Sequence, residues 1–219
     1  MSEEINRRPI ATRGAWWAKS LASALVRAGV TPNQVSVASI AFAIVGAALY
    51  FFTRQASPLV AICCFIGAAV CIQLRLICNL LDGMIAIEGG KKTKVGALYN
   101  EFPDRVADSL FLVLAGYAAS SSELGVVLGW AAALLAVLTA YVRVFGAAQG
   151  LKDDFCGPMA KQHRMAVLTA ASILAAAETG FSWPHRVMTG ALVLIVIGAT
   201  FTCVRRTWRI TQALQSRPE

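Results

Sequence analysis

The chain has 219 residues, of which 57% are hydrophobic and only 15% are charged. Soluble domains carry about 25% charged residues, so this composition excludes an ordinary soluble domain and favours a protein embedded in a bilayer. The net charge of +8 would suit nucleic-acid binding. However, the basic residues gather in the segments predicted to be cytoplasmic, as the positive-inside rule requires. We therefore expect membrane lipids as partners and no nucleic acid.

Residues 1–30 form a predicted N-terminal cytoplasmic segment without a secretory signal, because no apolar core followed by a cleavage site is present. Residues 15–28 have the periodicity of an amphipathic juxtamembrane helix lying on the cytoplasmic leaflet. An ordinary packed helix is the alternative. The predicted apolar face consists of Trp17, Leu21, Ala24, Leu25 and Ala28.

Six apolar segments follow, within a predicted membrane domain of residues 31–210 that precedes a cytoplasmic tail of residues 211–219. A membrane-crossing helix needs roughly 20 residues; the third and fifth segments reach this only by borrowing turns from polar flanks. Thr31 is a predicted N-cap and Pro32 suits the first helical position, so the first span begins there. The sequence thus predicts an all-α, multi-pass protein of the cytoplasmic (inner) membrane. The segments are 35–53, 55–74, 109–122, 124–142, 165–177 and 187–204.

Polar residues gather where the second predicted span gives way to the third. Asn79 and Asp82 are three residues apart, and Asn100 and Asp104 are four apart, so each pair shares a helix face. We expect the two faces to meet at the cytoplasmic boundary, where oxygen ligands suit Mg²⁺ or Mn²⁺. Helix capping does not explain Asp82 at a helix C-terminus, nor Asp108 inside an apolar run. The cluster therefore predicts a functional site.

Glycines flank this cluster. Gly83 and Gly96 would let a ligand approach the backbone closely. Residues 83–95 contain three glycines and three lysines, which predicts a cytoplasmic break that ends the second span near Leu81. In the fourth span, Gly125 and Gly129 form a pair that permits close helix contact or dimerisation.

The spacing of the cluster matches a known signature. Residues 79–104 read N-L-L-D-G-M-I-A-I, eight residues, then G-A-L-Y-N-E-F-P-D. This resembles the CDP-alcohol phosphotransferase family, whose signature is D-x-x-D-G-x-x-A-R, eight residues, then G-x-x-x-D-x-x-x-D. Three positions depart from the signature: Asn79, Ile87 and Asn100. The T-P-N-Q sequence before the first span, which includes Asn33, is also similar to the family's usual opening. The identical positions are Asp82, Gly83, Ala86, Gly96 and Asp104.

The resemblance implies a metal-dependent site. In the family, the four acidic positions hold two divalent metals that grip the diphosphate of a CDP-linked substrate. Carried over, Asp82 is a metal ligand, and Asp104 is both a ligand and the catalytic base. Asn79 and Asn100 become neutral carbonyl ligands, which implies weaker metal binding or a single ion unless Glu101 or Asp108 compensates. The matching small residues are implied substrate contacts: Asn33, Gly83, Ala86 and Gly96.

Three basic residues lie near the predicted site. Arg143 ends the fourth span and Lys161 precedes the fifth, so both can face the cavity and bind an anionic acceptor. The alternative is that they extend to lipid headgroups. Arg75 lies inside the second span, and its partner is either an acidic residue or a lipid phosphate.

The resemblance implies an enzyme that transfers a phosphatidyl group from CDP-diacylglycerol to an alcohol acceptor and releases CMP. It also implies a homodimer with its active site facing the cytoplasm. Three alternatives remain open. The first is transfer of a phospho-alcohol from a CDP-alcohol to a lipid hydroxyl. The second is an inactive relative that binds CDP-lipid. The third, a small-solute transporter, would need charges near the bilayer midplane.

Overall fold

The computed structural model describes residues 14–88, 95–119, 123–184 and 186–217, and the regular structure of these residues is helical throughout. The predicted all-α class is therefore confirmed. The elements are α1 (Trp16–Arg27), α2 (Pro32–Phe52), the short 3-10 helix η2 (Thr53–Gln55), α3 (Pro58–Glu88), α4 (Gly96–Ala118), α5 (Glu123–Ala148), α6 (Lys161–Gly180) and α7 (Val187–Gln215).

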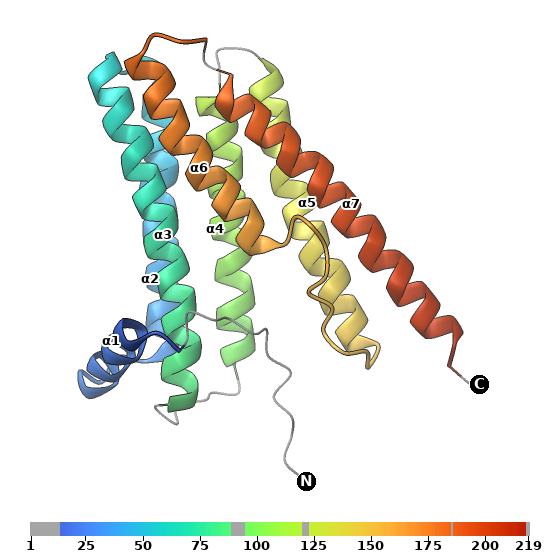
Figure 1. Cartoon of the computed structure of the whole chain (residues 1–219). Helices are drawn as coiled ribbons and strands as arrows, with labels where there is room; N and C mark the ends of the chain where they lie inside the picture. The colour runs from blue at the N-terminus through green and yellow to red at the C-terminus, as the bar shows by residue number, and fades with distance from the viewer. Residues whose placement is uncertain (1–13, 89–94, 120–122, 185, 218–219) are drawn as a thin grey trace.

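The long helices lie side by side as a bundle, and α1 crosses the foot of α2 and α3 (Figure 1). α2 packs against both α3 and α4, α4 packs on α5, α3 packs on α6, and α5 packs on α7. α6 begins part-way along the bundle rather than at its foot (Figure 1). Its first residues therefore lie close to the C-terminal half of α3 and the N-terminal half of α4.

Four helices of the described chain are long and apolar enough to cross a membrane. They are the segments Pro32–Gln55, Pro58–Ala86, Glu123–Ala148 and Val187–Gln215. The third and fifth predicted spans correspond to α4 and α6, whose polar inner turns keep them outside this group. Both helices run within the bundle (Figure 1), and their crossing of the membrane stays a prediction.

Two helix starts are set by side-chain caps. Thr31 accepts a hydrogen bond from the backbone N–H of Gln34, whose side chain accepts one from the N–H of Thr31. This capping box satisfies two otherwise unpaired donors and confirms the predicted start at Pro32. At the other end of the bundle, the buried carboxylate of Glu178 accepts hydrogen bonds from the N–H groups of Arg186 and Val187, at the start of α7.

The predicted end of the second span near Leu81 is wrong, because α3 continues to Glu88. Met84 and Ile85 are buried in one apolar cluster with Ala18 and Ala22 of α1. This tertiary packing stabilises the extra turns, and a glycine-rich sequence pattern does not reveal it. The predicted break includes residues 89–94, with their three lysines, which lie outside the described residues.

α1 packs on α3 through small residues. Ala18 and Ala22 are fully buried, whereas Trp16 is 82% exposed and Leu21 is 41% exposed. The apolar face predicted for this helix is therefore only partly the face that packs on the protein. The contact of this helix with the membrane surface stays a prediction, and the exposed Trp16 lies outside the face that the sequence predicted.

The predicted close contact at Gly125 and Gly129 occurs within the chain. A Cβ atom built on Gly116 of α4 would lie 2.6 Å from the carbonyl oxygen of Gly125 and 2.8 Å from the Cα of Gly129. These glycines let the C-terminal half of α4 and the N-terminal half of α5 touch backbone to backbone. Their surfaces are thus used inside the bundle, so they do not support dimerisation.

Candidate active site

Three carboxylates and one amide meet where the C-terminal half of α3 faces the N-terminal half of α4. Asp82 on α3, and Asp104 and Asp108 on α4, are all at least 95% buried. Asn79 on α3 donates a hydrogen bond from Nδ2 to Oδ1 of Asp104 at 2.6 Å. This bond joins the two halves of the motif and confirms that the predicted polar faces meet.

Arg75 lies one helical turn before Asn79 and is fully buried. Its Nη2 lies 3.0 Å from Oδ1 of Asp104 and 2.6 Å from Oδ1 of Asp108. The partners that the sequence left open are therefore two aspartates. Arg164 of α6 binds the other oxygen of Asp108, with Nη2 3.2 Å from Oδ2.

The second oxygen of Asp104 also faces cations. Lys161, the first residue of α6, donates from Nζ to Oδ2 of Asp104. Arg105 Nη2 lies 3.8 Å from the same oxygen. Burying a carboxylate costs several kcal/mol unless charged or polar partners compensate. These neighbours explain how Asp104 can be buried next to Asp108.

Asp82 has a different environment. Its Oδ2 accepts a hydrogen bond from the hydroxyl of Ser36 on α2 at 2.7 Å. Among the described residues, no ion pair joins Asp82 to a lysine or arginine within 4.0 Å, although Asp82 interacts electrostatically with Asp104 and Lys161. Asp82 is therefore the motif carboxylate with the fewest cationic neighbours.

Arg143 connects α5 with α4 and with the segment 149–160. Its Nη2 lies 2.5 Å from Oε1 of Glu101, and its Nη1 lies 2.9 Å from Oδ1 of Asp153. The guanidinium carbon also lies 5.4 Å from the ring centre of Phe155. Glu101 pairs in addition with Arg105 at 3.0 Å. Both carboxylates proposed to compensate for the asparagines, Glu101 and Asp108, are thus engaged by arginines.

The segment 149–160 is held against α7. Buried Arg206 donates from Nε to the carbonyl oxygen of Cys156 at 2.9 Å and from Nη1 to that of Thr139 at 2.8 Å. Gly157 has a φ of 124°, which favours glycine. A Cβ atom there would lie 2.4 Å from the side chain of Thr202. This segment is therefore fixed to both α5 and α7.

Asp154 in this segment has a shifted pKa. Partial burial raises the pKa of Asp154, but hydrogen bonds from the backbone N–H and the thiol of Cys156 lower it, as do the charges of Arg209 and Arg206. The lowering contributions win, so the pKa lies below its usual range. Asp154 therefore remains charged near neutral pH and anchors the segment to α7.

The other predicted site residues lie around this cluster. Gly83, Ala86 and Gly96 are half-buried on α3 and α4, and Asn33 is half-buried in the first turn of α2. Asn100 lies on α4 between Gly96 and Asp104, but its side chain lies outside the described part of the structure. Their roles in binding stay predictions.

Several residues of the cluster could not be assigned from the sequence. Ser36 resembles any small polar residue in an apolar helix, although a second serine three residues later hints at a polar face. Arg105 and Arg206 fit the same pattern as headgroup-binding arginines. Arg105 lies on α4 itself, whereas the packing of α2 brings Ser36 to Asp82 and that of α7 brings Arg206 to the segment 149–160.

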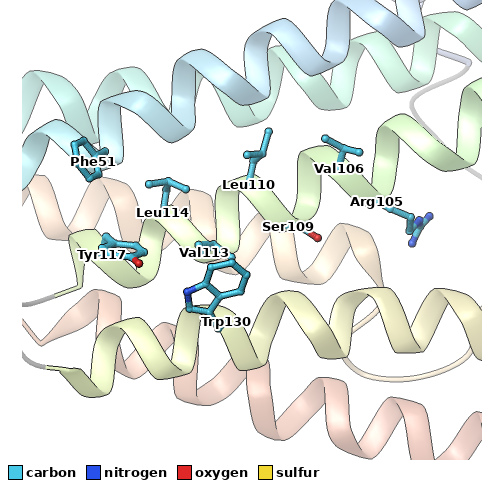
Figure 2. Close-up of a pocket in the computed structure, with 9 residues that line it drawn as sticks. All are labelled: Phe51, Arg105, Val106, Ser109, Leu110, Val113, Leu114, Tyr117 and Trp130. Carbon is cyan, nitrogen blue, oxygen red and sulfur yellow. The ribbon is translucent and has the colours of Figure 1, made fainter.

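An apolar groove of about 710 Å³ runs along α4 next to the cluster (Figure 2). Arg105, the neighbour of Asp104, lies at one end, and Tyr117 lies toward the other. The two residues are twelve positions apart on α4, a length of about 18 Å at 1.5 Å per residue. The groove is lined by Phe51, Arg105, Val106, Ser109, Leu110, Val113, Leu114, Tyr117 and Trp130.

Comparison with known proteins identifies the family. The sequence profile of the CDP-alcohol phosphatidyltransferases matches residues 29–204. The chain belongs to this family. It is accordingly a membrane-bound transferase of substituted phosphate groups that acts in phospholipid biosynthesis.

Relatives within the family include phosphatidylinositol phosphate synthases. The enzyme of Mycobacteroides abscessus is 28% identical over 197 residues, which cover 85% of this chain and 80% of that protein. The enzyme of Mycolicibacterium smegmatis is 31% identical over 153 residues, which cover 65% of this chain and 63% of that protein.

Solved structures share the fold. The phosphatidylinositol phosphate synthase of Mycobacterium tuberculosis with CDP-DAG bound has a TM-score of 0.74 at 19% identity, covering 90% of this chain and 94% of that one. Its complex with manganese and citrate has a TM-score of 0.73 at 19% identity, covering 89% and 88%. At this identity the likeness establishes the fold alone.

The donors of this site fit one divalent ion better than two. Mg²⁺ and Mn²⁺ bind through one or two carboxylates plus substrate phosphates, and Asp82 can supply one such carboxylate. Asp104 instead accepts bonds from Arg75, Asn79 and Lys161. Within the described residues, no three Asp, Glu, His or Cys side chains are grouped to hold a metal. Among the described motif carboxylates, Asp82 is therefore the one with an oxygen available to a divalent ion.

Proposed function

We propose that this protein transfers a phosphatidyl group from CDP-diacylglycerol to an alcohol and releases CMP. The observation that supports this proposal most directly is the bond between Asn79 and Asp104. It brings both halves of the family motif together at one end of the bundle. Membership of a family of phosphatidyltransferases supplies the reaction class.

In this proposal Asp82 holds a divalent ion, Mg²⁺ or Mn²⁺. When bound, the ion supplies positive charge that neutralises the diphosphate of the substrate and the departing CMP. Ser36 orients the Asp82 carboxylate through its hydrogen bond. Phosphoryl transfer depends mainly on positioning and charge neutralisation, which matches a rigid, polar cluster between packed helices.

Asp104 is the proposed general base. It would accept the proton of the acceptor hydroxyl at Oδ2, the oxygen that Lys161 now occupies. Arg75 and Asn79 hold Oδ1 and so fix the direction of the carboxylate. A well-placed base of this kind accelerates a reaction by about 10²- to 10⁴-fold.

The proposed acceptor carries a phosphate or another anionic group. Lys161 pairs with Asp104 and Arg143 pairs with Glu101, and Arg105 lies beside both of these carboxylates. An anionic acceptor would replace Glu101 or Asp104 as a partner of these cations. The relatives named as phosphatidylinositol phosphate synthases make inositol phosphate the first acceptor to test.

The proposed CDP-lipid substrate agrees with the surroundings of the site. Its tails would remain in the leaflet while its headgroup reaches the cytoplasmic end of α3 and α4. The groove of Figure 2 is almost entirely apolar and begins at Arg105, so it suits an acyl tail. We further propose that the site faces the cytoplasm and that the protein forms a homodimer, as the family resemblance implies.

The test is release of CMP from CDP-diacylglycerol by the purified protein, with inositol phosphate, glycerol 3-phosphate, serine and inositol as acceptors. We expect activity that needs a divalent ion and falls at least 10²-fold in Asp104→Asn. Glu178→Gln, at the opposite end of the bundle, is the matched control and should stay active. Absence of CMP release with every acceptor would favour the inactive-relative alternative.

The alternative transfer of a phospho-alcohol is tested in the same assay. In this version of the assay, the substrates are radiolabelled CDP-choline and diacylglycerol instead of CDP-diacylglycerol and an alcohol acceptor. Label appearing in a lipid from CDP-choline, and none from CDP-diacylglycerol, would overturn the proposed direction of transfer.

A further inference from the structure

Arg75 is an unusual residue for the interior of an apolar helix. It is fully buried, and its Nη2 alone reaches both motif-side carboxylates, Asp104 and Asp108. Its Nε and Nη1 have no hydrogen-bond partner among the described residues. A buried arginine with unpaired donors is costly, so its charge must serve the two aspartates.

The cations around these two aspartates occupy the carboxylate oxygens that a metal ion would bind. Oδ1 of Asp104 accepts bonds from Arg75 and Asn79, which occupy its two lone pairs. Oδ2 accepts from Lys161, and Arg164 holds the free oxygen of Asp108. Asp104 and Asp108 thus have four cationic partners, which are Arg75, Arg105, Lys161 and Arg164. A second divalent ion would enter a site that its own side chains already neutralise.

Asn79 contributes to this arrangement. The amide of Asn79 donates a hydrogen bond to Asp104, whereas an ionised aspartate at this position would repel the carboxylate and call for a cation between the two. Asn79 and Arg75 therefore act in the same way. Each donates a hydrogen bond to Asp104 and so occupies an oxygen that a metal ion would otherwise bind.

We propose that Arg75 is the resident cation of this site and replaces one divalent ion, so that the protein binds a single ion, at Asp82. The inference rests on the proposed function for its substrate, a nucleotide diphosphate. The inference concerns the number of bound ions and the residue, Arg75, that takes the place of a second ion. Arg75 acts through Asp104 and is a positioning residue.

The test counts bound Mn²⁺ by electron paramagnetic resonance, with metal-free protein in detergent and CDP-diacylglycerol present without an acceptor. We expect one Mn²⁺ per chain, lost in Asp82→Asn. Arg75→Met should raise the count to two, and Arg75→Lys, which keeps the charge, should leave it at one. Two ions in the unaltered protein, or none, would overturn the proposal, as would a count of one in folded Arg75→Met.

Asp104→Asn tests the proposal even if Arg75→Met does not fold. If Arg75 replaces the second ion, Asp104 is no ligand, and the variant should still bind one Mn²⁺ with an affinity changed less than threefold. Loss of the ion would overturn the proposal. The count is independent of catalysis: one ion without CMP release refutes only the proposed function, and two ions with CMP release refute only the role of Arg75.

Discussion

Ser36 on α2 donates a hydrogen bond to Oδ2 of Asp82 on α3 at 2.7 Å, although 46 residues separate them in the chain. Both residues are at least 95% buried. The bond therefore connects the first predicted span to the motif carboxylate that has the fewest cationic neighbours.

Ser36→Ala should destabilise the protein by about 1–3 kcal/mol, because a buried carboxylate oxygen loses its donor and keeps its desolvation cost. Denaturant unfolding in detergent measures this change. Ser39→Ala is the matched control, since the hydroxyl of Ser39 bonds, among the described residues, to the carbonyl oxygen of Ser36 within the same helix. Equal losses in the two variants would contradict a special role for the bond to Asp82.

Asn79→Asp should make stability depend on divalent metal. The substitution replaces a donor 2.6 Å from Asp104 with a second carboxylate, and like charges at this distance repel. We expect a lower melting temperature in the presence of a chelator and recovery of most of the loss with Mn²⁺. Asn79→Ala loses the same bond without adding charge, so its melting temperature should not recover with metal; recovery in both variants would refute this explanation.

Gly129→Ala should destabilise the bundle by about 1–3 kcal/mol through overpacking. The added Cβ would lie 2.8 Å from the Cα of Gly116 and 2.8 Å from the carbonyl oxygen of Leu112, and neither backbone atom can move easily. Gly190→Ala is the control, because its Cβ would meet nothing within 4 Å. That variant should gain about 0.5–1 kcal/mol from helix propensity. Melting curves that shift in the same direction would contradict the close crossing of α4 and α5.

Asp154→Asn should lower stability near neutral pH and lose this effect in acid. The pKa of Asp154 is lowered in the folded protein, so its charge stabilises the fold above the ordinary pKa of about 3.9. This contribution disappears as the pH falls through the lowered folded value. The difference in melting temperature from the unaltered protein should be constant from pH 8 to pH 5 and shrink below about pH 4. A difference that grows in acid would contradict the assigned sign.

The sequence is informative where local physics decides the structure. Apolar segments of membrane-crossing length predict α2, α3, α5 and α7, and the cap at Thr31 predicts where α2 begins. The i+3 and i+4 spacings of the motif predict that two polar helix faces meet, and the bond from Asn79 to Asp104 confirms it.

The sequence is less informative where tertiary packing decides. The extension of α3 to Glu88 depends on the alanines of α1, which lie more than 60 residues away in the chain. The partners of Arg75 depend on the rotation of α4 relative to α3. Arg206 reads as a headgroup-binding residue, yet α7 turns it inward to two carbonyl groups.

The glycine contact of α4 and α5 has a mechanical consequence. These helices touch backbone to backbone at Gly116 and Gly129, while near their opposite ends an ion pair joins Glu101 to Arg143. An anion that binds Arg143 would replace Glu101 as its partner, so it would loosen the two helices at this polar end and leave the glycine contact in place.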